Sequence, residues 1–224
     1  MAHAGVLSVL ELVAIVSCGY GLFALSSGIH LFGSLGLAYG SLWFLLGATS
    51  NICGLVGLYL MMYGPVEQAA RGSQPWIQYH YLLAWLTIVL GYPTFLTMIW
   101  LAHYPSPYDQ LNLVLALLPL LAWAKRRTKT IVLTTQIVSG IAILSHIWIC
   151  VVASQIYGLI GAGIMIINVT ALSIPTKYNL WGFSSREMYV IGLSITSAIF
   201  AQEVSTMVKG GVVHVSDVFK VPAF

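Results

Sequence analysis

Three ionisable side chains lie inside long apolar stretches of this 224-residue sequence: Glu11, His146 and Glu203. An unpaired charge in a hydrocarbon environment costs a few kcal/mol or more, so such residues usually face one another, a cavity or a hydrogen-bonding neighbour. Carboxyl and imidazole groups in that setting can hold a proton, pass it on or bind a cation. These three residues are therefore the first candidates for a functional site.

Two of the candidates, Glu11 and His146, lie on stripes of polar side chains that have the spacing of one face of an α-helix. Around His146, polar side chains recur every three or four residues, and this is the most sustained polar stripe in the chain. Glu11 lies on a shorter stripe of its own. If both stripes face inward, they form one polar seam with the last apolar stretch. The candidate seam residues are Glu11, Gln136, Ser139, His146 and Glu203.

The same residues have structural explanations. Polar side chains at this spacing often only hydrogen-bond to neighbouring helices and hold them together. A neutral, protonated Glu11 bonded to a neighbouring helix belongs to this class. Glu203 lies near the end of its apolar stretch, where a carboxylate can reach the lipid headgroups instead.

Other kinds of chemistry have no support in the sequence. There is no Walker loop, nucleophile elbow, HExxH or paired acidic motif. The cysteines are odd in number, show no CxxC spacing and all lie in apolar stretches, at Cys18, Cys53 and Cys150. This pattern argues against a disulfide framework or a zinc site. We therefore expect no cofactor and no bound metal.

Haem ligation by two histidines needs both side chains at matching depth on facing helices. His80 and His103 lie at opposite ends of one apolar stretch, about 34 Å apart along a helix, so they cannot share a haem. His30 with His146 is the pair that remains.

The amino-acid composition indicates which kind of secondary structure positions these residues. Hydrophobic residues make up 59% of the chain and charged residues 7%, whereas soluble domains carry about 25% charged residues. The apolar residues come in stretches of about 18 to 25, each long enough to cross a hydrocarbon core of about 30 Å. The sequence therefore predicts an all-α, polytopic membrane helical bundle.

Seven spans are expected, and short polar connections between them predict that residues 1–224 form a single transmembrane helical domain. The fourth span is short. The uncharged, glycine-rich stretch at 27–42 fits either a re-entrant loop or an eighth helix, and Pro93 should kink the third span. The expected spans lie near residues 5–26, 41–62, 80–102, 108–124, 131–153, 155–173 and 188–206.

Basic residues indicate the orientation. Cytoplasmic loops collect Lys and Arg, so the cluster at residues 125–129 should be cytoplasmic. Counting spans outward from this cluster places the N-terminus in the cytoplasm and the C-terminus outside. The net charge of +3 comes largely from the same cluster, so it reports topology and not a nucleic-acid partner. The expected partners are membrane lipids, with a small-molecule or lipid substrate or other membrane subunits as further options.

The region of the second span carries Tyr39-Gly40, Asn51-Ile52, Tyr59, Tyr63 and Pro65. In these residues the sequence resembles the second-span region of the small seven-span terpene cyclases of fungal meroterpenoid pathways, over less than a fifth of the chain. The resemblance implies seven helices and an isoprenoid substrate. The family has a Trp-Glu pair here, with the Glu as proposed proton donor, whereas this chain has Gly54 and Leu55 near that position.

Three classes of function follow. We favour a transporter or channel-like protein, proton-coupled or carrying a small molecule, in which Glu11 and His146 line the path. In a scaffold or accessory subunit, the seam would only hold helices or a partner together. In an intramembrane enzyme acting on a lipid or isoprenoid, Glu11 or Glu203 would be the acid and His146 its partner.

Overall fold

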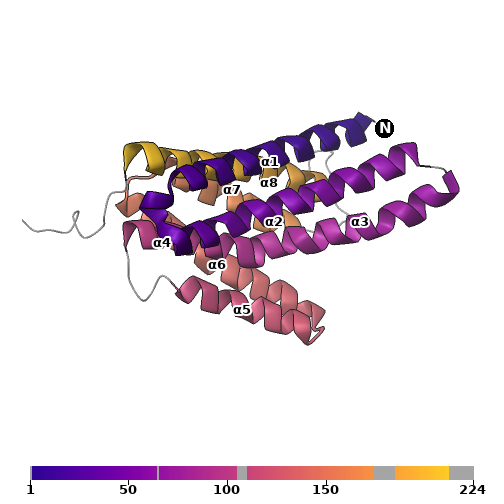
Figure 1. Cartoon of the computed structure of the whole chain (residues 1–224). Coiled ribbons are helices and arrows are strands. Elements are labelled where there is room, and N and C mark those ends of the chain that lie inside the picture. The colour runs from indigo at the N-terminus through magenta and orange to yellow at the C-terminus, as the bar shows by residue number, and fades with distance from the viewer. Residues whose placement is uncertain (1, 65, 105–109, 174–184, 212–224) are drawn as a thin grey trace, which may run out of the picture.

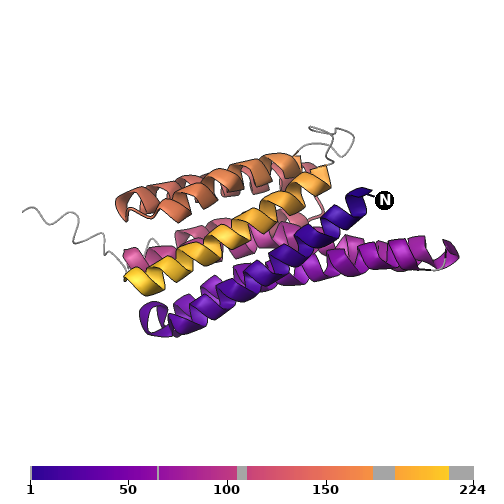
Figure 2. The same cartoon turned by 90° about the horizontal axis from the view of Figure 1, so that it is seen from above.

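The computed structural model describes residues 2–64, 66–104, 110–173 and 185–211, which are almost entirely helical and contain no strand. Within these ranges, seven helical rods run back and forth along one axis (Figures 1 and 2). The third rod contains three consecutive elements, α3, the π-helical turn η1 and α4. The elements are α1 (Ala2–Ser27), α2 (Ile29–Tyr63), α3 (Val66–Leu86), η1 (Thr87–Gly91), α4 (Tyr92–His103), α5 (Leu111–Ala124), α6 (Thr128–Val152), α7 (Ile156–Ser173) and α8 (Ser185–Gly210).

The rods are suited to a membrane. Five of them are long and apolar enough to cross one, namely α1, α2, the third rod, α6 and α8. The other two are shorter, and the 14 residues of α5 cover only about 21 Å at 1.5 Å per residue. The outer faces carry large apolar side chains, such as Phe23 and Leu144, which are 67% and 68% exposed. Soluble proteins rarely expose continuous apolar surface of this kind. The expectation of an all-helical chain with several apolar, membrane-length helices is thus confirmed.

The glycine-rich stretch at 27–42 is neither a re-entrant loop nor an eighth helix, so both expectations were wrong. α1 ends at Ser27 and α2 follows almost at once. Gly33, with φ 66° and ψ 176°, interrupts α2 just after its first turn, and this conformation is available almost only to glycine. Beyond Gly33 the chain stays helical to Tyr63, which satisfies its backbone without a separate hairpin. The missing side chain of Gly40 leaves room for Met98 of α4.

The segment between the expected spans 41–62 and 80–102 is also helical from Val66 onward. The third rod therefore begins 14 residues before the expected start of the span at residue 80. The apolar pattern marks only the part of a helix that lipid or protein covers. A helix can continue past it with polar side chains, because its backbone hydrogen bonds are internal.

Around Pro93, the third rod departs from regular α-helix. The backbone N–H of Tyr92 bonds to the carbonyl of Thr87, five residues back, instead of four. Proline has no N–H to donate to the carbonyl four residues earlier, so the wider turn accommodates it. Such π-turns occur frequently at functional sites. Here the turn comes directly before Tyr92, whose side chain is fully buried in the bundle.

The core that surrounds this point is aromatic. Trp43 and Phe44 of α2, Phe95 of α4 and Phe200 of α8 are all fully buried. Phe95 and Phe200 stack with ring centroids 4.5 Å apart. α8 lies between α1 and α7 and packs against both (Figure 2). This central position lets α8 present side chains to opposite halves of the bundle.

Candidate functional site

The structure brings two of the candidate residues together, His146 on α6 and Glu203 on α8. The Nε2 atom of His146 lies 3.2 Å from Oε1 of Glu203, and neither side chain has exposed surface. The two residues are 57 positions apart in the sequence, so only the packing of α6 near α8 makes them neighbours. The two atoms are at hydrogen-bond distance, and a hydrogen bond in a low-dielectric environment is stronger than one in water.

Tyr92 holds the other side of the imidazole ring. Its hydroxyl lies 3.0 Å from Nδ1 of His146. Because each ring nitrogen has a partner, the ring cannot rotate without breaking a hydrogen bond. The π-turn just before Tyr92 and the hydroxyl contact therefore belong to one arrangement that fixes the orientation of His146.

Cys150 adds a third polar group at Glu203. It lies one helical turn after His146, and its Sγ donates to Oε1 of Glu203 at 3.6 Å. The ligand atoms of His146, Cys150 and Glu203 all lie within 4.8 Å of one another. We call Tyr92, His146, Cys150 and Glu203 the buried cluster. Within the part of the chain that the structure describes, Oε2 of Glu203 is buried and has no hydrogen-bond partner.

Apolar groups enclose the buried cluster. The ring of Phe200 lies 5.5 Å from that of His146 and the ring of Phe95 lies 6.2 Å from it. On the α7 side, Gly158 packs so closely that a β-carbon there would overlap Sγ of Cys150 and Oε1 of Glu203. Exclusion of water by these groups strengthens every polar interaction inside the cluster.

The expectation that Glu203 could lie at a helix end among headgroups was wrong. α8 continues past it to Gly210, and the side chain is fully buried. The expected span ended at residue 206, whereas the helix continues to Gly210, so Glu203 lies further from the helix end than the apolar pattern indicates.

Glu11 is also fully buried, but in a different place. A β-carbon on Gly54 of α2 would lie 2.5 Å from both of its carboxylate oxygens. The carbonyl of the preceding Leu10 accepts a hydrogen bond of 2.8 Å from Ser194 of α8. Ser194 and Glu203 are nine residues apart on α8, which puts them on roughly opposite sides of that helix. α8 therefore separates Glu11 from the buried cluster, and the expected single seam is divided.

The two remaining seam residues, both on α6, differ in burial. Ser139, two turns before His146, is buried, whereas Gln136 is exposed. Gln136 borders an apolar groove among the third rod, α6 and α7, where Nε1 of Trp85 donates to Oγ1 of Thr135 at 3.1 Å. The polar stripe of α6 therefore faces the bundle interior at Ser139 and His146 but lies on the outer surface at Gln136.

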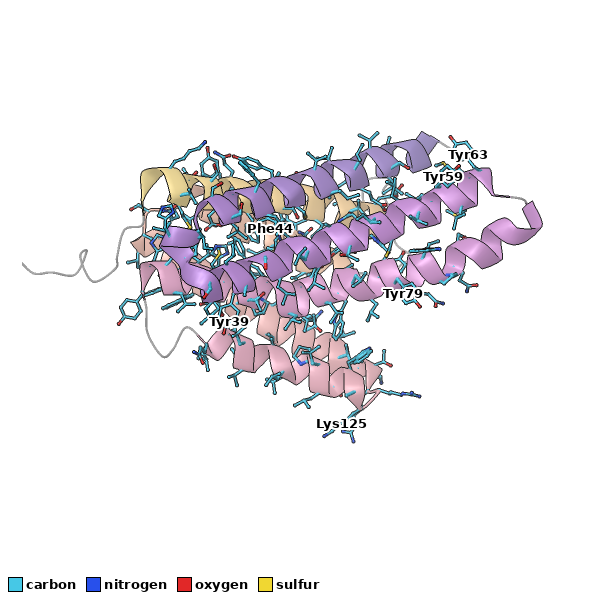
Figure 3. The ribbon with its side chains drawn as sticks, in the orientation of Figure 1. Tyr39, Phe44, Tyr59, Tyr63, Tyr79 and Lys125 are labelled. Atoms are coloured by element: carbon cyan, nitrogen blue, oxygen red, sulfur yellow. The ribbon has the colours of Figure 1, made fainter. Side chains whose placement is uncertain are left out.

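A second groove lies between α1 and α2. It is lined by Ser8, three residues before Glu11, and by Tyr59 and Tyr63 near the end of α2 (Figure 3). Neither this groove nor the one beside Gln136 is lined by His146 or Glu203. The buried cluster therefore lies apart from both grooves.

The histidine pair considered for haem does not come together. His30 is exposed near the start of α2, whereas His146 is buried and directs its two ring nitrogens at Tyr92 and Glu203. His80 is buried too, and its Nδ1 lies 2.8 Å from the carbonyl of Ser50 on α2.

Two members of the buried cluster escaped the sequence analysis. Tyr92 was not singled out among the twelve tyrosines, and Cys150 was not counted among the candidate residues, because cysteines in apolar stretches without CxxC spacing argued against a metal site. The available signals were the four-residue spacing from His146 to Cys150 and the position of Tyr92 beside Pro93. The absence of CxxC spacing says nothing about ligands that come from two helices.

Comparison with known proteins adds no assignment, because no family model matches the chain and no significant match was found among curated proteins or solved structures. The site is therefore judged on its own geometry.

The contact of Gly158 with the buried cluster gives a first testable prediction. Gly158→Ala should push Cys150 and Glu203 apart and lower the free energy of unfolding by about 1–3 kcal/mol, the usual cost of overpacking. Gly163→Ala on the same helix is the matched control, since nothing lies within 4 Å of its added β-carbon. That control should be neutral or stabilising by about 0.5–1 kcal/mol. Equal effects of the two substitutions in detergent unfolding would contradict the packing described here.

Proposed function

We propose that this protein is a membrane transporter or channel-like protein that moves a solute together with, or in exchange for, protons, and that the buried cluster is its proton-binding site. The observation that carries the proposal is the fully buried contact between His146 and Glu203 on two different helices. Ionisable residues in apolar helices are costly to keep and commonly belong to proton relays or ion pathways.

Stability alone does not explain the pair. Replacing a buried ion pair by well-packed apolar residues is often neutral or stabilising, so helix packing could be achieved without His146 or Glu203. By contrast, protonation of the pair changes the interaction that joins α6 to α8. A proton can therefore be coupled to a movement of one helix relative to another, which is what proton-coupled transport requires.

The enclosure of the buried cluster fits an occluded state. Phe95, Phe200 and Gly158 surround it, and neither of the two grooves is lined by its residues. Glu11, on the other side of α8, is better explained as a group that holds α1 against α2. We therefore assign it no part in proton binding.

The arrangement of the rods supports a topology. The N-terminal end of α1 and Lys125 at the end of α5 lie at the same end of the bundle, and the C-terminal end of α8 lies at the other (Figures 1 and 3). With the basic cluster at 125–129 in the cytoplasm, the N-terminus is cytoplasmic and the C-terminus extracytoplasmic. This orientation includes α5 and α7 among the membrane helices.

Proton movement is tested in liposomes that contain a pH-sensitive dye and carry an inside-negative potassium diffusion potential. The wild type should acidify the lumen faster than protein-free liposomes do. Glu203→Gln should reduce the rate to the protein-free level, because glutamine keeps the shape but cannot exchange a proton. Glu187→Gln, at the start of α8, and Glu11→Gln should retain the wild-type rate. Proton movement absent from the wild type both under this potential and, for electroneutral exchange, under an outward gradient of a divalent metal ion would overturn the assignment. Full activity in Glu203→Gln would overturn it as well.

The topology is tested with small epitope tags. A tag inserted at Lys125 and one at Met1 should both be accessible only after the cytoplasmic side is exposed, whereas a tag after Phe224 should be accessible from outside. Tags at Lys125 and Phe224 on one side of the membrane would mean that the three rods after residue 127 do not all cross it.

A further inference from the structure

We propose that His146, Cys150 and Glu203 form a binding site for one divalent transition-metal ion of the Zn²⁺ or Co²⁺ type. The inference rests on the proposed function for its physiological meaning, because it names the solute that would be exchanged for protons. The site itself can be tested by binding alone.

Two of the three distances between the ligand atoms match a tetrahedral site. Bonds of about 2.0–2.1 Å to nitrogen and oxygen and about 2.3 Å to sulfur place tetrahedral N and O ligands about 3.3 Å apart, and O and S ligands about 3.5 Å apart. In the structure, Nε2 of His146 lies 3.2 Å from Oε1 of Glu203, and Sγ of Cys150 lies 3.6 Å from the same oxygen. Nε2 of His146 and Sγ of Cys150 lie within 4.8 Å of each other. An ion could therefore bind once a small side-chain movement brings this pair to about 3.5 Å.

The surroundings of the ligands fit a metal site as well. Oε2 of Glu203 is buried without a hydrogen-bond partner in the described ranges, which leaves part of the carboxylate unsatisfied in the absence of a cation. The hydroxyl of Tyr92 can accept a hydrogen bond from Nδ1–H of His146, which leaves the lone pair of Nε2 for the ion. Partners of this kind on the second ring nitrogen are a regular feature of metal-binding histidines.

The charges balance. One proton in each of the two hydrogen bonds, Sγ of Cys150 to Glu203 and Nε2 of His146 to Glu203, makes the three side chains of the metal-free cluster sum to zero. Binding needs a thiolate, a neutral imidazole with a free Nε2 and a carboxylate, so two protons leave as one M²⁺ enters. The sum is again zero, and the apolar enclosure by Phe95 and Phe200 never has to hold a net charge.

The donor set identifies the class of ion. A combination of thiolate, imidazole and carboxylate suits Zn²⁺ and related borderline ions, whereas Mg²⁺ and Ca²⁺ prefer oxygen ligands throughout. Three protein ligands leave one tetrahedral position for water or for an exchanging ligand. An open position of this kind is compatible with an ion that enters and leaves.

Metal content of the full-length protein tests the site directly. Protein purified in detergent from cells grown with added Zn²⁺ should contain about one zinc ion per chain by mass spectrometry. Protein from cells grown with Co²⁺ should show a thiolate-to-cobalt charge-transfer band in the near ultraviolet. Cys150→Ser should lower the metal content at least tenfold and remove the band, and Glu203→Gln should also lower the content. Size-exclusion chromatography checks that each variant is folded.

Cys18→Ser and Cys53→Ser are matched controls, because both thiols are buried in apolar helices outside the cluster. They should keep both the ion and the band. Tyr92→Phe should keep the site but weaken zinc affinity by about 10–100-fold, the usual effect of losing the partner of a ligating histidine. Such a graded loss in a protein that stays folded differs from the effect of misfolding.

A folded wild type without stoichiometric metal, or a Cys150→Ser variant that keeps it, would overturn the metal site. The liposome assay, run without a membrane potential and with external Zn²⁺, separates this result from the proposed function, because exchange of Zn²⁺ for two protons moves no net charge and makes the lumen alkaline. Bound zinc in detergent without any zinc-dependent proton movement would support the site and count against transport. Proton movement lost in Glu203→Gln, but with no metal bound by the wild type, would support transport and overturn the metal site.

Discussion

A carboxylate can remain at the centre of an apolar bundle only if neighbouring groups neutralise it, and the contact between His146 and Glu203 meets this constraint. Much of the local structure serves the same contact. α8 must lie near α6, the π-turn precedes the tyrosine whose hydroxyl holds the imidazole, and α7 must carry glycine at residue 158. The π-turn departs from regular helix, and the close contact at residue 158 excludes any side chain larger than that of glycine. A function of the His146–Glu203 pair would explain why the structure keeps both features.

α8 organises the polar groups because two of its faces differ. One face presents Ser194 to the backbone of α1 near Glu11, and the opposite face presents Glu203 to His146. The first contact joins helices through a backbone carbonyl, which needs no ionisable group. The second joins two ionisable side chains directly. The two buried carboxylates can therefore have different roles in one bundle.

The sequence predicted the approximate positions of the helices and the three ionisable residues, because both depend on local properties: apolar length, and charge within an apolar stretch. It could not predict which of these residues meet. Glu11 and His146 have equally inward-facing stripes, but whether they meet depends on the rotation of each helix about its axis. The same reason explains why Gln136 faces outward although Ser139, one turn later, is buried. Tyr92 was missed because a π-turn, which no periodic pattern reveals, determines its direction.

The direct energetic coupling of His146 to Glu203 is the measurement that tests the account most closely. A double-mutant cycle with His146→Ala, Glu203→Ala and the double variant gives this coupling from the free energies of unfolding in bicelles. For two residues in direct buried contact we expect a coupling energy within about 0.5–3 kcal/mol, with the double variant less destabilised than the sum of the single variants. Additive effects, with a coupling energy near zero, would show that the two side chains do not interact and would contradict the central claim.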